Sequence, residues 1–115
     1  MQVRDIMTRN PFKIERSCTI KEVSQILLEH GLNSVPVVDR NYRLLGIITR
    51  ADIFRTILSS YDKLHSEESY WDFEKIEKGA KEAGQLKVEE VMSKPVITVE
   101  ENIPVVRALT NLTLG

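Results

Sequence analysis

The chain has 115 residues, of which 42% are hydrophobic and 29% charged, and its net charge at neutral pH is −1. This length suits one domain or two very small ones, and a balanced charge excludes the concentrated basic surface that general nucleic-acid binding needs. Cys18 is the only cysteine, so no disulfide can form within the chain. No apolar run is long enough to span a membrane. We therefore expect a cytoplasmic protein with no membrane insertion.

The first predicted elements are a short strand and a helix. A turn at residues 8–11 precedes residues 12–14, which alternate like a short strand. Thr19 and Glu22 stand three residues apart, as in a capping box, and predict the start of a helix. Gly31 stands where a helix end favours a residue at positive φ.

Two apolar runs follow, at residues 35–38 and 44–48, with a polar turn between them. Their β-branched residues predict two antiparallel strands. Neither run alternates with polar residues, so we expect both strands to be covered on both faces. Thr49 and Asp52 then repeat the spacing of a capping box, and the apolar residues after them have helical spacing.

Residues 61–87 predict a helical linker. Four apolar residues lie at helical spacing, and Gly84 is a plausible helix stop: Phe73, Ile76, Ala80 and Ala83. The aromatic cluster of Tyr70, Trp71 and Phe73 either packs the linker onto its own domain or docks a partner, and packing is the commoner role.

The sequence contains an internal repeat, since VRDIMTRNPF at residues 3–12 matches VEEVMSKPV at residues 88–96. The second copy continues into an apolar helix pattern but has no counterpart of residues 35–52. Half a unit would leave apolar surface uncovered, which favours association or disorder. The predicted division is a complete unit at residues 1–60, a linker at 61–87, and the opening strand and helix of a second unit at 88–115.

The stretch VPVVD at residues 35–39, followed by GIITRAD at residues 46–52, closely resembles the core of the cystathionine β-synthase (CBS) domain family. The resemblance covers residues 1 to about 60 without a gap. It implies an α/β fold built on a βαββα motif. It also implies a regulatory module that binds AMP, ATP or S-adenosylmethionine.

In members of this family each nucleotide cleft is shared between two motifs. The resemblance implies that Asp52 accepts hydrogen bonds from both ribose hydroxyls and that Thr49 donates to a phosphate at the helix N-terminus. Gly46 would let a ring approach the strand, and residues 93–97 would supply the adenine wall. The predicted ligand-binding residues are Gly46, Thr49, Arg50, Asp52, Ser93, Pro95 and Ile97.

Simpler roles stand beside these. Thr49 and Asp52 serve equally as a helix cap, which does not exclude ligand binding, and Gly46 equally marks a crowded strand crossing. Arg50 is explained as well by solubility. Cys18 has no nearby histidine, and the two histidines lack ligand spacing, so the sequence predicts neither a catalytic thiol nor a metal site.

The sequence thus predicts no enzyme and no cofactor other than a regulatory ligand. The leading hypothesis is a homodimeric module that senses an adenine nucleotide or a related adenosyl compound through its interface. Two alternatives remain: a ligand-free dimerisation module, and a fragment of a larger enzyme or transporter that such a module regulates.

Overall fold

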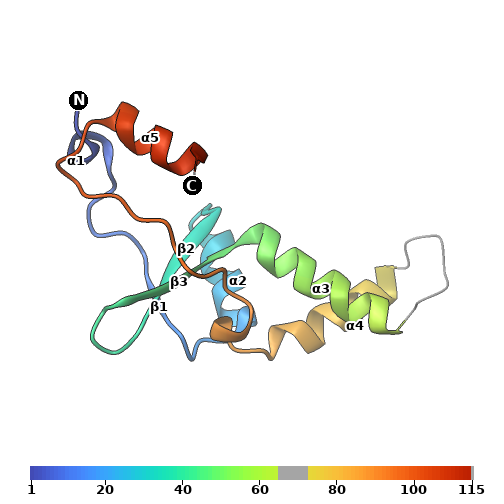
Figure 1. The fold of residues 1–115 in the computed structure, drawn as a ribbon. Coiled ribbons are helices and arrows are strands. Elements are labelled where there is room, and N and C mark those ends of the chain that lie inside the picture. The colour runs from blue at the N-terminus through green and yellow to red at the C-terminus, as the bar shows by residue number, and fades with distance from the viewer. Residues whose placement is uncertain (65–72, 115) are drawn as a thin grey trace.

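The computed structural model describes residues 1–64 and 73–114. Within these residues the elements follow one another in this order: α1 (Val3–Ile6), β1 (Ile14–Glu15), α2 (Ile20–Glu29), β2 (Ser34–Val38), β3 (Leu44–Thr49), α3 (Arg50–Leu64), α4 (Phe73–Gly84), the 3-10 turn η1 (Val88–Glu90) and α5 (Val105–Leu114). The predicted βαββα order, here β1 to α3, is confirmed. The sheet lies centrally, α3 and α4 extend to one side, and α1 lies beside α5 at the opposite end (Figure 1).

The sheet has the strand order β1-β2-β3. β1 runs parallel to β2, with Ile14 opposite Val37, and β2 runs antiparallel to β3, with Val35 opposite Ile48. The Asp39 carboxylate closes the hairpin by accepting the N–H groups of residues 41 and 43 at 2.8 and 3.0 Å. The predicted pair of antiparallel strands is therefore confirmed.

The expectation that both strands are covered on both faces holds only in part. Three of the five residues of β2 are buried, but β3 alternates. Gly46 and Ile48 are buried, whereas Leu45, Ile47 and Thr49, which alternate with them, are only half-buried. The edge of β3 that does not pair with β2 pairs instead with a later part of the chain, in a bridge between Ile47 and Ser93.

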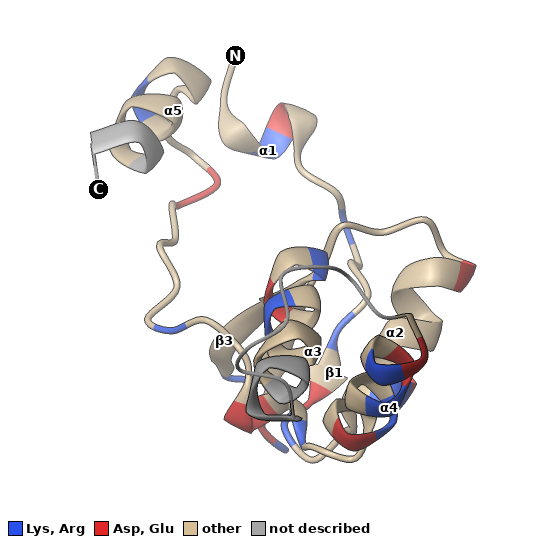
Figure 2. Ribbon diagram, turned by 90° about the vertical axis from the view of Figure 1, so that its right-hand side faces the viewer, with Lys and Arg blue, Asp and Glu red and all other residues tan. Residues whose placement is uncertain are grey.

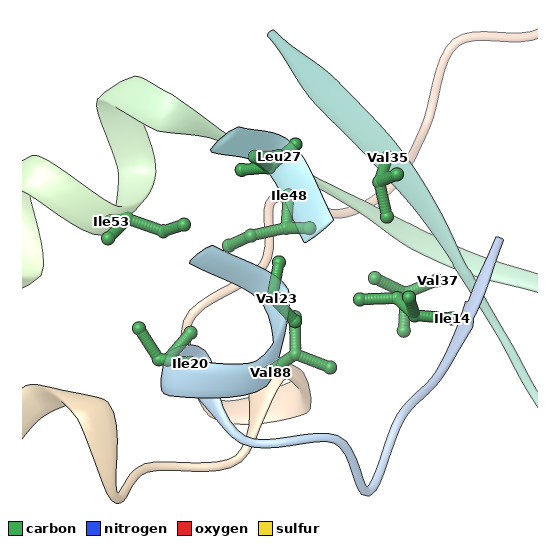
Figure 3. Packing of buried hydrophobic residues seen from close by; sticks show 9 residues of the cluster. All are labelled: Ile14, Ile20, Val23, Leu27, Val35, Val37, Ile48, Ile53 and Val88. Atoms are coloured by element: carbon green, nitrogen blue, oxygen red, sulfur yellow. The ribbon is translucent and has the colours of Figure 1, made fainter. Parts of the chain in front are cut away.

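The core is formed between α2 and the sheet. The α2 helix begins at Thr19, whose hydroxyl accepts the N–H of Glu22 at 3.2 Å as the capping pattern predicts. Nine buried side chains point toward one another in Figure 3, and eight come from residues 14–53: Ile14, Ile20, Val23, Leu27, Val35, Val37, Ile48 and Ile53. The ninth is Val88, which lies in the second copy of the repeat.

The turns that open the two repeats each dock onto the other repeat. The N–H of Val88 donates to the carbonyl of Cys18 at 2.7 Å, and the N–H of Val3 donates to the carbonyl of Ile103 at 2.9 Å. The two donors, Val3 and Val88, are 85 residues apart in sequence, and so are the two acceptors, Cys18 and Ile103. The isolated bridges Thr19–Lys87 and Gln2–Pro104 are related in the same way, since Lys87 is the counterpart of Gln2 and Pro104 is the counterpart of Thr19. The α1 turn therefore belongs spatially with α5, as Figure 1 shows.

Some boundaries differ from the sequence-based expectations. The first strand is Ile14–Glu15 and not residues 12–14, and residues 3–6 form a short helix that was not predicted. The strand expected at the start of the second unit does not form within residues 91–104. In the first unit that position pairs with β2, whereas the second repeat has no counterpart of β2 in the sequence.

The linker helix α4 spans the predicted positions and ends at the predicted Gly84. Phe73, however, is 79% exposed, so this member of the aromatic cluster does not pack against residues 1–60. Tyr70 and Trp71 lie outside the described residues. In the described part of the chain, no helix is both long enough and apolar enough to cross a membrane.

Candidate ligand-binding site

Thr49 and Asp52 form the predicted capping box at the start of α3. The Thr49 hydroxyl accepts the N–H of Asp52 at 3.0 Å, and the Asp52 carboxylate accepts the N–H of Thr49 at 3.1 Å. These bonds satisfy backbone donors that a helix start leaves without partners. The Asp52 residue is only 6% exposed. The local sequence thus fixes a buried carboxylate where the sheet meets α3.

Three groups donate hydrogen bonds to the Asp52 carboxylate. Besides the Thr49 N–H, Arg55 pairs with Oδ1, and the Ser93 Oγ lies 3.2 Å from both Oδ1 and Oδ2. Burial on its own would raise the pKa of Asp52, but the hydrogen bonds from Thr49, Arg55 and Ser93 outweigh it and hold that pKa below its ordinary value. Asp52 is therefore a charged group at neutral pH that only accepts hydrogen bonds.

Ser93 reaches Asp52 because its backbone pairs with β3. The Ile47 N–H donates to the Ser93 carbonyl at 3.0 Å, and the Ser93 N–H donates to the Ile47 carbonyl at 2.9 Å. The crossing is close because residue 46 is glycine: a Cβ there would lie 2.6 Å from the Met92 sulfur and 2.9 Å from the Ser93 carbonyl oxygen. Gly46 thus admits a neighbouring chain segment, which is the simpler of its two predicted roles.

The remaining predicted residues are placed differently. Arg50 Nε donates to the Leu32 carbonyl at 2.7 Å, so this guanidinium is engaged at the loop after α2 and does not pair with Asp52. Pro95 and Ile97 are exposed apolar residues that follow Ser93 within four positions. The structure therefore brings together Gly46, Thr49, Asp52 and Ser93, and it leaves Pro95 and Ile97 as exposed neighbours of that group.

Two residues of this constellation were not identified from the sequence. Arg55 follows Asp52 by three positions on a helix, a spacing that places opposite charges on one face and could have indicated the pair. Met92 packs against Gly46. Its match to Met7 in the repeat identified the segment but did not indicate what it contacts.

Cys18 is not part of the group of residues around Asp52. Burial, followed by the Glu22 carboxylate, raises the pKa of the Cys18 thiol, which keeps this thiol protonated and weakly nucleophilic at neutral pH. Within residues 1–64 and 73–114, no three His, Cys, Asp or Glu side chains are grouped so that they could hold a metal ion.

Two cavities are lined by other residues. One, of about 430 Å³, lies at the ends of β1 and β2, where three cationic residues mix with three acidic ones: Arg16, Arg40, Lys87, Glu15, Asp39 and Glu89. The other, of about 760 Å³, is a groove between α2, α3 and α4 whose apolar lining includes Ile20, Leu28, Ile53 and Ile57. Asp52 lines neither cavity.

Figure 2 shows charges of both signs on α3 and α4. Among the residues whose burial the structure describes, the one buried charged side chain is that of Asp52.

Comparison with known proteins identifies relatives of this chain. The family model described as the CBS domain matches residues 3–59. An L-aspartate semialdehyde sulfurtransferase from Methanocaldococcus jannaschii is 30% identical over 103 residues, which cover 90% of this chain but 16% of that enzyme. Among eight curated relatives, the chain spans between 7% and 34% of the relative's length.

Solved structures agree with the family match. The CBS domain of a CBS domain-containing membrane protein from Sphaerobacter thermophilus superposes with a TM-score of 0.74 at 26% identity, covering 98% of this chain and 71% of that chain. The CBS domain pair of protein MJ0100, in complex with 5′-methylthioadenosine and S-adenosyl-L-methionine, superposes with a TM-score of 0.68 at 26% identity, covering 99% and 73%. The matched residues and these structural relatives together show that the chain belongs to the CBS domain family.

Proposed function

We propose that this chain is a regulatory module that binds an adenosine-containing ligand, such as AMP, ATP or S-adenosylmethionine, at Asp52 and signals occupancy through its interfaces. The observation that carries the proposal is the buried, ionised Asp52 carboxylate, which is held at a helix N-terminus directly opposite Ser93 of the second repeat. The related MJ0100 pair, which binds 5′-methylthioadenosine and S-adenosyl-L-methionine, supports this ligand class.

The chemistry of Asp52 suits a ribose diol. Two neighbouring hydroxyls can each donate to one oxygen of a carboxylate, and an ionised carboxylate accepts at both oxygens. Thr49 uses an oxygen lone pair to accept the Asp52 N–H. Its hydroxyl also helps to stabilise the Asp52 carboxylate, and it would turn to donate its hydrogen to a bound phosphate. The partial positive charge at the N-terminus of α3 favours an anionic group at the same place.

Residues 93–97 are proposed to cover the base. Pro95 and Ile97 are exposed apolar residues beside Ser93, and Ile97 is 50% exposed. An adenine ring laid against them would remove apolar surface from water on both partners. The backbone of Ser93 pairs with β3, and the chain continues to residues 101–105, which bond to residues 1–4. This segment therefore connects the ligand site to the α1 and α5 end of the molecule.

The test is calorimetric titration of AMP, ATP and S-adenosylmethionine into the wild type and into Asp52→Ala and Thr49→Val. Loss of charge-assisted bonds in Asp52→Ala should weaken binding by about 1.5–3 kcal/mol, roughly tenfold or more. Asp39→Ala is the matched control, since Asp39 also accepts backbone N–H groups but lies at the hairpin turn. A wild type that binds none of the three ligands would remove the proposal.

A second candidate is a ligand-free association module, and the exposed apolar side chains favour it. On α5, Val106 is 76% exposed, and on α2 and α3, Leu28 and Phe54 are 73% and 54% exposed. Exposed apolar surface that forms a continuous patch commonly marks a site of association with another protein. We propose a homodimer in either case. Sedimentation that gives a monomer at high protein concentration would contradict the homodimer.

The regulated activity is proposed to belong to an enzyme or transporter, either fused to this module or bound by it. The chain spans 16% of the sulfurtransferase that it resembles, so modules of this kind occur inside larger proteins. A change in sedimentation or melting on ligand addition would support signalling through the interface. Ligand binding that alters neither property would argue against it.

A further inference from the structure

We propose that the Ser93 side chain is a built-in competitor of the ligand, which occupies the acceptor positions of Asp52 until a ribose diol displaces it. This inference rests on the proposed function and adds a residue that sets the affinity of the site. It predicts that Ser93 weakens binding, although sequence reasoning makes Ser93 a ligand contact.

The first argument is the position of the hydroxyl. Ser93 Oγ lies 3.2 Å from Oδ1 and 3.2 Å from Oδ2 of Asp52, so it straddles the two oxygens to which a diol would donate. A carboxylate has about four acceptor positions. The Thr49 N–H takes one on Oδ2, and Arg55 takes one on Oδ1. A diol therefore has to take the positions that Ser93 faces.

The second argument is that Ser93 can leave without disturbing the fold. Its backbone is fixed by the two hydrogen bonds to Ile47, at 3.0 and 2.9 Å, which do not involve the side chain. Rotation about χ1 between staggered positions moves the hydroxyl away while the main chain stays in place. Displacement therefore needs a change of rotamer and no local unfolding.

Arg55 is a weaker competitor because it contacts one oxygen only. Its side chain is 71% exposed, and an exposed ion pair loses much of its strength to water and salt. A diol hydroxyl can also share Oδ1 with Arg55. Ser93 is thus the group whose removal should change affinity most.

The expected loss of ligand affinity follows from the populations of the two side-chain arrangements, closed on Asp52 and open. A ligand that binds only the open side-chain arrangement has its apparent affinity reduced by the fraction of molecules in that arrangement. The hydrogen bond to a charged carboxylate favours the closed arrangement by about tenfold. Removing the hydroxyl should therefore tighten binding by about the same factor.

The experiment compares the wild type with Ser93→Ala by calorimetric titration of AMP, ATP and S-adenosylmethionine. We expect Ser93→Ala to bind about tenfold more tightly, and Ser93→Thr, which keeps a hydroxyl, to restore the wild-type affinity. Thr8→Ala is the matched control, because Thr8 is the counterpart of Ser93 in the first repeat, 85 residues earlier. It should leave affinity unchanged.

The outcomes separate the two proposals. Unchanged or weaker binding in Ser93→Ala, with binding retained by the wild type, overturns the competition and leaves the proposed function standing. No binding to any variant overturns both. Should Ser93→Ala fail to fold, nuclear magnetic resonance on the wild type still decides: saturating AMP must change the χ1 rotamer of Ser93, and an unchanged rotamer contradicts the competition.

Discussion

Val3 and Val88 donate equivalent backbone hydrogen bonds, each to a carbonyl of the other repeat. Each is the first residue of a short helical turn, and each donates its N–H to the segment just before a helix of the other repeat, at 2.9 Å to Ile103 before α5 and at 2.7 Å to Cys18 before α2. The exchange ties residues 1–4 to residues 101–105 at the start of α5, and it ties η1 to the main core. The segment that carries Ser93 is thus anchored immediately before it reaches Asp52.

Replacing Val88 tests how much that anchor contributes. Val88 is fully buried in the core, so Val88→Ala should lower the free energy of unfolding by about 2 kcal/mol through lost apolar burial and the cavity left behind. Val3→Ala is the matched control, because Val3 is only half-buried and should cost less. Urea denaturation measures both, and equal costs would show that the two turns contribute alike.

Gly46 is predicted to resist substitution. In Gly46→Ala the new methyl would lie 2.6 Å from the Met92 sulfur and 2.9 Å from the Ser93 carbonyl oxygen. The Ser93 carbonyl belongs to the main chain, so relieving this clash would disturb the packing around it. We expect a loss of about 1–3 kcal/mol in the free energy of unfolding. Thermal melting checks this value.

Gly84→Ala is the control for Gly46→Ala. The nearest atom to its new methyl is the Lys21 Cβ at 3.5 Å, an ordinary contact. Alanine also favours a helix over glycine, so this variant should be neutral or more stable by about 0.5–1 kcal/mol. If both variants melt alike, the close crossing at Gly46 does not limit stability.

Much of the complete unit could be predicted from the sequence because its signals are local. The hairpin, the α2 cap and the Thr49–Asp52 box each depend on residues at most a few positions apart, and the structure has all three. The end of α4 at Gly84 is likewise a local signal.

The contacts between repeats could not be predicted in the same way. Ser93 and Asp52 are 41 positions apart, and no pattern of spacing indicates that a hydroxyl will face that carboxylate. The expected second strand also depended on a partner, since β1 itself is only two residues long and is held by β2. Without such a partner, local propensity alone does not hold a strand.

Cys18 is predicted to react slowly with alkylating reagents. Burial, followed by the negative charge of Glu22, raises the pKa of its thiol, and the thiolate is the reactive form. The alkylation rate of the folded protein at pH 8 should therefore lie well below that of the same chain unfolded in urea. Equal rates in the two states would show that the fold does not protect Cys18.

Asp52 is predicted to make the stability of the fold depend on pH. Its pKa is held below the ordinary value, because hydrogen bonds from Thr49, Arg55 and Ser93 outweigh burial. A carboxyl whose pKa is lower in the folded state stabilises the fold fully above the unfolded pKa of about 3.9. This contribution is lost as the pH falls from that value through the folded pKa.

Melting curves of the wild type and of Asp52→Asn between pH 7 and pH 2.5 test this dependence. The wild type should be the more stable at pH 7, and the difference should shrink as the pH falls below about 4, because protonation removes the charge that the asparagine already lacks. Asp39→Asn is a useful companion, since hydrogen bonds from the backbone of Arg43 and Asn41 also lower the pKa of Asp39. A difference between the wild type and Asp52→Asn that stays constant down to pH 2.5 would mean that the charge on Asp52 does not stabilise the site.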